Sequence, residues 1–134
     1  MPREGHLPER LSSRFPQSGE QARELVREFV RAVEPDASTT DVDAVLLGVS
    51  ELVSNAVRHA GGVTDFHLEA PKDGGVVVEV SDSSVRRPRT VQINPAVPGG
   101  FGWLLVRELA SDVTVTLRPG KGKTIRAAFP LRPA

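Results

Sequence analysis

The longest amphipathic pattern in the chain begins at Val42 and constrains the fold more than any other segment. Apolar residues recur along it every three or four positions, at Val42, Val45, Leu46, Val49, Leu52, Val53, Ala56, Val57 and Ala60. This spacing is typical of a helix with one buried face. Thr40 or Asp41 is predicted to cap its start. Gly61-Gly62 is predicted to end it, because glycine readily adopts the left-handed conformation that follows many helices.

Shorter patterns on both sides of this segment predict further helices and paired strands. In chain order they predict a strand at 11–15, a helix at 22–33 capped by Ser18 and Gln21 and ended by Pro35, a hairpin at 66–80, a helix after Gly102, and a hairpin at 113–129. Because helices and hairpins are segregated along the chain, the order favours an α+β fold, a two-layer α/β sandwich, over a doubly wound sheet.

Length and charge narrow the function classes. The chain has 134 residues, which fits one domain, expected at 10–134 after a flexible tail at 1–9. Its 17 basic residues balance 17 acidic ones, which disfavours direct nucleic-acid binding. Cysteine is absent, so disulfides and thiolate metal sites are excluded. The polar start and the lack of a long apolar run predict no signal peptide and no membrane segment, and hence a cytoplasmic location.

Glu51 and Asn55 lie one helical turn apart, nearly opposite the apolar stripe of the long helix. An amide oxygen is a hard ligand suited to Mg²⁺, and a nearby carboxylate can accept a proton from a hydroxyl group. Judged alone, the pair is more typical of a solvated helix face than of a binding site. His59 fits either a helper role in the site or a favourable interaction with the helix dipole.

Two later segments add polar groups and glycines. Asp82 follows a strand and could accept a hydrogen bond from an exocyclic amine, although aspartate at a strand end often only caps a turn. Gly99-Gly100-Phe101-Gly102 precedes a helix, where backbone N–H groups attract phosphate, but a glycine run is also a common hinge. Gly122-Lys123-Thr124 resembles the end of a P-loop. That assignment fails because Leu117 replaces the required glycine and a strand pattern follows.

In their order and spacing, these segments resemble the boxes of the GHKL (histidine-kinase-like) ATPase domain. Glu51 to Asn55 resembles its N box, Asp82-Ser83-Ser84 its D-x-G box, and Gly100 to Val106 its G-x-G-L-x-L-V box. Gly122-Lys123-Thr124 resembles its late Gly-Thr segment. The resemblance covers about residues 10–130. A free-standing domain of this length with E-L-V-x-N-A-V-x-H-A is most similar to bacterial anti-sigma-factor serine/threonine kinases.

The resemblance implies a Bergerat-type ATP-binding fold, with a mixed, mostly antiparallel sheet and three helices on one face. ATP-Mg²⁺ would lie between the second helix and a lid at about 85–101. Glu51 would be the catalytic base and Asn55 the Mg²⁺ ligand. The nucleotide-binding residues implied are Asn55, Asp82, Ser84, Gly100, Gly102, Trp103, Leu104 and Thr124. Asp82 would bind the adenine amine, and Thr124 would sit near the base.

The resemblance also implies partners and a reaction. The chain would phosphorylate a serine of a STAS-domain anti-sigma-factor antagonist, bind a sigma factor, and be able to form a homodimer. Three departures favour a non-catalytic ATP-binding or degenerate protein-interaction module as the alternative: Ser84 replaces the glycine of D-x-G, Trp103 replaces a leucine, and the lid is short and proline-rich. A sensor histidine kinase fragment is disfavoured, because no membrane span or phosphoacceptor helix precedes the domain.

Overall fold

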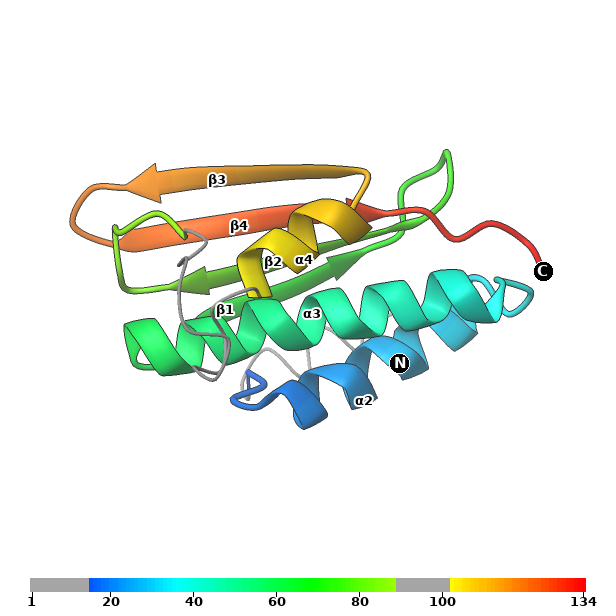
Figure 1. The fold of residues 1–134 in the computed structure, drawn as a ribbon, viewed down its shortest axis with the longest axis horizontal. Helices are drawn as coiled ribbons and strands as arrows, with labels where there is room; N and C mark the ends of the chain where they lie inside the picture. Colours follow the sequence, from blue (N-terminus) through cyan, green and yellow to red (C-terminus); the bar gives the residue numbers. More distant parts are fainter. Residues whose placement is uncertain (1–14, 89–101) are drawn as a thin grey trace, which may run out of the picture.

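The computed structural model describes residues 15–88 and 102–134, and these ranges form helices packed on one face of a single sheet (Figure 1). In chain order the elements are α2 (Gly19–Val33), α3 (Thr39–Ala60), β1 (Val63–Glu69), β2 (Val76–Asp82), α4 (Gly102–Leu109), β3 (Asp112–Arg118) and β4 (Gly122–Phe129). The α+β fold with two layers is therefore confirmed. The predicted strand at 11–15 lies almost entirely outside the described residues.

The four strands follow the order β1-β2-β4-β3. Each neighbouring pair in the described sheet is antiparallel, so the mixed pairing expected from the resemblance is not found there. The central pair joins β2 to β4, which are separated in sequence by α4 and β3. In that register Asp82 lies opposite Lys123 and Val80 lies opposite Ile125. This pairing brings the end of β2 beside the start of β4.

Helix α3 lies between the sheet and α2, and it contacts α4 as well (Figure 1). Most of its predicted apolar stripe is buried: Val45, Leu46, Val49, Leu52, Val53 and Ala56. Gly48 faces the ring of Phe129, and a Cβ atom at this position would lie 2.6 Å from Phe129 Cζ. Glycine weakens a helix interior by up to about 1 kcal/mol. Here it allows the aromatic ring of β4 to pack directly on the helix backbone.

The start of α3 differs from the prediction, whereas its end agrees with it. The N-cap is Ser38, whose Oγ accepts a hydrogen bond from the Asp41 backbone N–H, so neither Thr40 nor Asp41 caps the helix. The Asp41 carboxylate is instead held by Arg132. At the other end Gly61 adopts the left-handed conformation with φ of 80°, as the sequence predicted.

The capping interaction of α2 is formed in part as predicted. Ser18 Oγ accepts from the Gln21 N–H at 3.1 Å, while Gln21 Oε1 accepts from the N–H of Gln17 rather than from that of the cap residue itself.

Among the helices that the structure describes, none is long and apolar enough to cross a bilayer.

Candidate functional site

A cavity of about 470 Å³ opens where the C-terminal half of α3 faces the end of β2 and the start of β4. Its lining residues are Leu52, Asn55, Ala56, His59, Val80, Asp82, Ser84, Arg86, Arg87, Pro88, Trp103, Lys123 and Ile125. Its size is within the range of small-molecule and cofactor sites in proteins. The cavity gathers residues from four of the segments that the sequence singled out.

One part of the cavity wall is apolar. Leu52 and Ala56 come from α3, Val80 and Ile125 from adjacent strands, and Trp103 from α4. Aliphatic side chains and an aromatic ring offer flat contact area to a planar ligand. Such walls suit a heteroaromatic ring better than a flexible polar chain.

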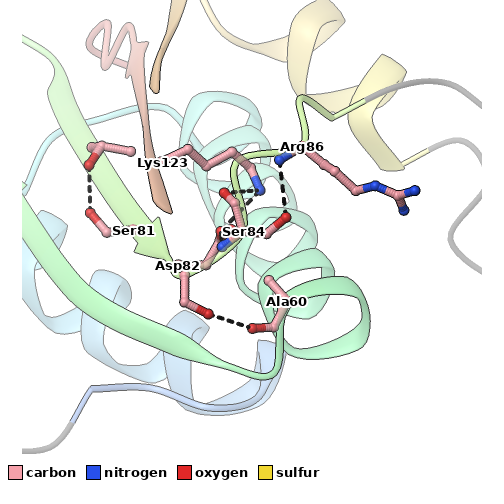
Figure 2. Close-up of polar contacts among 8 residues, drawn as sticks. Ala60, Ser81, Asp82, Ser84, Arg86 and Lys123 are labelled. Carbon is pink, nitrogen blue, oxygen red and sulfur yellow. Dashed lines mark hydrogen bonds and ion pairs between the residues drawn. The ribbon is translucent and has the colours of Figure 1, made fainter. Parts of the chain in front are cut away.

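The polar groups at the sheet include a buried ion pair between Asp82 and Lys123. Lys123 Nζ lies 3.0 Å from Asp82 Oδ1, and both side chains are less than a tenth exposed. The same Oδ1 accepts from the Ser84 N–H at 2.9 Å, and Lys123 Nζ also donates to the Ser84 carbonyl at 3.5 Å (Figure 2). Buried charges are tolerated only when paired and hydrogen-bonded, and these bonds meet that requirement. Asp82 therefore caps its turn and faces the cavity at the same time.

Sequence reasoning did not assign a role to Lys123. A usable signal was present, because Ile125, Ala127 and Phe129 alternate along a predicted strand, and all three are buried in the structure. Alternation along the strand places Lys123 on that same face. What the pattern did not supply was the β2–β4 register that sets Lys123 opposite Asp82.

Thr124 lies elsewhere than expected. It stands between the cavity-lining residues Lys123 and Ile125, so strand alternation directs its side chain to the other face of the sheet. There its Oγ1 shares a hydrogen bond of 2.8 Å with Ser81 Oγ. Figure 2 shows Ser81 on the side of the strand away from the Lys123 ammonium. The expected position of Thr124 beside the base is corrected by this geometry.

Glu51 and Asn55 meet α4 at Gly102. Gly102 is buried, and a Cβ atom built on it would collide with Glu51 Oε1 and lie 3.6 Å from Asn55 Nδ2. Glycine thus allows the first turn of α4 to rest directly on these two half-buried side chains. Asn55 lines the cavity, whereas Glu51 lies beside it.

The donor set around Asn55 fits a divalent cation shared with a ligand. Asn55 Oδ1 accepts from Arg58 Nη1 at 3.3 Å, so a divalent cation would have to displace this guanidinium to reach the oxygen. Within 15–88 and 102–134, no group of three or more histidine or acidic side chains could hold a metal by itself. Mg²⁺ is usually held by one or two protein oxygens together with substrate phosphates and waters. Asn55 would supply such an oxygen.

Two arginine side chains lie in the solvent-facing part of the cavity. Arg86 and Arg87 are exposed and line it, and His59 lines it from the last turn of α3. Guanidinium groups bind phosphate oxygens through charge-assisted hydrogen bonds. The cavity therefore combines apolar walls, a buried donor–acceptor pair and exposed cations.

The remaining predicted residues fall outside this cluster or outside the described ranges. Leu104 on α4 is 40% exposed and does not line the cavity. Gly100 and most of the predicted lid at 85–101 lie outside the described residues. The structure brings Asn55, Asp82, Ser84 and Trp103 into one cavity, as their joint assignment requires.

The chain matches the model of the histidine kinase-like ATPase domain over residues 15–129, and it belongs to that family. Among solved structures it is similar to the histidine kinase domain of the blue-light activated histidine kinase from Erythrobacter litoralis EL346. That chain is 20% identical with a TM-score of 0.52, and the match covers 84% of this chain and 64% of that one. A second structure of the blue-light activated kinase is 19% identical with a TM-score of 0.54, covering 82% and 42%.

No match was found among curated proteins. The chain spans 64% and 42% of the two solved chains, so the likeness to them concerns the fold of the shared domain. Membership of the family makes the chain an ATPase domain of the histidine-kinase-like type. Domains of this type bind ATP, usually with Mg²⁺, which agrees with the character of the cavity.

Proposed function

We propose that the chain is an ATP-binding regulatory protein that acts as a serine/threonine kinase of the anti-sigma-factor type. Its substrate would be a serine of a STAS-domain antagonist, and its second partner a sigma factor. One observation carries the nucleotide part of this proposal: a single cavity is lined by Asn55 on α3, Asp82 on β2 and Trp103 on α4. These residues come from three segments that are far apart in the sequence.

Each polar group has a distinct role in this proposal. Asp82 accepts a hydrogen bond from the adenine amine, and the apolar walls enclose the ring. Arg86 and Arg87 attract the phosphates. Asn55 would hold Mg²⁺, which would supply positive charge to the phosphate oxygens. Glu51 receives the proton of the partner's serine hydroxyl as its oxygen bonds to the γ-phosphorus and ADP leaves.

A non-catalytic ATP-binding or interaction module is the second candidate. Two contacts favour it: Arg58 donates to the amide oxygen of Asn55, and Lys123 neutralises Asp82. In addition, Ser84 stands in the cavity wall where the family pattern has glycine. A protein of this type would keep the fold and its partner surfaces while transferring no phosphoryl group.

Titration calorimetry with ATP and Mg²⁺ separates the two candidates in stages. We expect Mg²⁺-dependent ATP binding that weakens at least tenfold in Asn55→Ala, because the hard oxygen ligand is lost. Flat heats at millimolar nucleotide would remove the nucleotide part of the proposal. Binding without phosphotransfer would favour the non-catalytic module.

Phosphotransfer is then measured with radiolabelled ATP and a purified STAS-domain antagonist. Glu51→Gln should retain ATP binding and lose at least a hundredfold in transfer rate, a typical contribution of a general base. Glu108→Gln is the matched control, because Glu108 is an exposed glutamate on α4 away from the cavity. Equal rates for the two variants would contradict the assignment of Glu51.

The proposed function also includes a cellular location and an oligomeric state. A kinase that acts on sigma-factor regulators works in the cytoplasm, and dimerisation is compatible with such a role. Co-purification with a sigma factor, and its release after the antagonist is added, would test the partner assignment. Light scattering of the pure protein would give the oligomeric state.

A further inference from the structure

We propose that Lys123 is a second residue that recognises the adenine base. Its ammonium donates a hydrogen bond to a ring nitrogen next to the exocyclic amine, from which Asp82 accepts a hydrogen bond. This inference rests on the proposed nucleotide function and specifies which atoms of the base are read. It concerns the buried Asp82–Lys123 pair, whose two members both line the cavity.

The hydrogen bonds of the pair leave one acceptor and one donor for a ligand. Asp82 Oδ1 accepts from both Lys123 Nζ and the Ser84 N–H, and Oδ2 has no partner among the described residues. The Lys123 ammonium has three N–H donors. It directs one to Asp82 Oδ1 and one to the Ser84 carbonyl, which leaves a third. A free carboxylate oxygen therefore lies next to a free ammonium donor.

The electrostatics of the pair define the ligand edge that it can bind. Asp82 and Lys123 carry opposite charges, so together they present no net charge to this part of the cavity. A charged ligand group would gain little from a neutral pair and would lose its hydration. An uncharged ligand edge that has a donor beside an acceptor can bond to both the free carboxylate oxygen and the free ammonium N–H. Adenine has such an edge, because its exocyclic amine lies between ring nitrogens N1 and N7.

A purely structural ion pair would behave differently. Buried pairs often stabilise a fold by little and can be replaced by apolar residues. A structural Lys123 would have no reason to respond to a single ring atom of a bound nucleotide. The sensitivity of binding to that atom therefore distinguishes a base-reading lysine from one that only neutralises Asp82.

The test compares ATP with 1-deaza-ATP and 7-deaza-ATP by calorimetry on the unmodified protein, so that no substitution is needed. Each analogue replaces one ring nitrogen beside the amine with a C–H group. We expect one analogue to bind at least tenfold more weakly than ATP and the other to bind like ATP, because a hydrogen bond to a charged donor is lost. If both analogues bind as ATP does, the inference is overturned and the proposed function stands.

Two variants locate the effect on Lys123. Lys123→Met should bind ATP and the sensitive analogue equally, because the donor is gone. Lys121→Gln is the matched control, since Lys121 is exposed in the β3–β4 turn, and it should keep the preference of the unmodified protein. A Lys123→Met protein that keeps the preference would contradict the inference.

Folding is controlled separately. Lys123→Met leaves a buried carboxylate without its partner, so the double variant Asp82→Asn/Lys123→Met removes both charges while an amide oxygen still accepts from the amine. It should also bind ATP and the sensitive analogue equally. If the unmodified protein binds no ATP at all, the proposed function itself fails, an outcome distinct from equal binding of the three nucleotides.

Discussion

Two buried aspartates, each paired with a basic side chain, lie near opposite ends of helix α3, and they differ in how many of their oxygens are already hydrogen-bonded. At the N-terminal end, Asp41 accepts from the Arg132 N–H, Nε and Nη2 at 2.7, 2.9 and 2.7 Å. Both of its oxygens are used. Beside the C-terminal end, Asp82 receives its two bonds on a single oxygen and lines a cavity.

The difference separates a structural aspartate from a binding aspartate. The hydrogen bonds from Arg132 lower the pKa of Asp41 to about 2, and Asp41 in turn raises the pKa of the Arg132 guanidinium. Asp41 ties the segment after β4 to the first turn of α3, and Ala37, just before that helix, pairs with Pro133. Hydrogen-bond saturation, rather than burial or charge, is what distinguishes the two carboxylates.

Asp82→Ala should have the largest effect, because it removes both a ligand acceptor and the partner of a buried cation. We expect the free energy of unfolding to fall by about 3 kcal/mol, as found when one partner of a buried pair is removed. ATP affinity should fall at least tenfold. Urea denaturation and calorimetry measure the two quantities, and Asp73→Ala, in the exposed β1–β2 turn, is the control. Unchanged affinity in a folded Asp82→Ala protein would argue against the binding role.

Asp41→Asn should reduce stability without affecting the cavity. We expect a loss of about 1–2 kcal/mol at neutral pH, discounted because the Arg132 side chain is 72% exposed and partly screened by solvent. The Kd for ATP should stay within about twofold, since charge-assisted bonds at one end of a rigid helix do not reach the other. A large change in Kd would show that the two pairs are coupled.

The stability that Asp41 contributes should depend on pH. The pKa of Asp41 is lowered from 3.8 to about 2 in the folded state, so its stabilising contribution is fully present above the unfolded value. It should be lost as the pH falls from about 5 toward 2. The difference in unfolding free energy between the unmodified protein and Asp41→Asn should therefore shrink over this range. A difference that stays constant down to the lowest pH would contradict the lowered pKa.

Gly102→Ala should have the smallest effect on stability and act mainly on the site. The added Cβ meets the flexible end of Glu51, which can move aside at a cost below about 1 kcal/mol. Phosphotransfer should drop about tenfold, because a small displacement of a catalytic group is costly. Gly48→Ala is the counterpart: its Cβ meets the rigid Phe129 ring, so stability should fall by about 1–2 kcal/mol while ATP affinity is unchanged.

The sequence predicted the elements well because their periodicities are local. The stripe of α3, the glycine at Gly61 and both hairpin turns all depend on neighbours within a few residues. The cap of α3 was misplaced because Ser38, Thr40 and Asp41 are all acceptable capping residues. Tertiary structure decides among them, since Asp41 is engaged by Arg132.

The site was predicted only in part, because some of its residues belong to recognisable motifs whereas the position of others depends on strand pairing. Asn55, Asp82, Ser84 and Trp103 were identified through motif resemblance, and their convergence followed from the predicted fold. Lys123 and the position of Thr124 depend on the pairing of β2 with β4, which are not consecutive in the chain. The face of Thr124 was nonetheless available from strand alternation, which motif matching overrode.

The burial of the Asp82–Lys123 pair has a consequence for the response to ionic strength. Mobile ions screen exposed charges within about 10 Å at 0.1 M salt, but they reach buried pairs much less. Arg86 and Arg87 are exposed, whereas Asp82 and Lys123 are not. Added salt should therefore weaken the hold on a triphosphate tail while leaving the affinity for the bare nucleoside nearly constant.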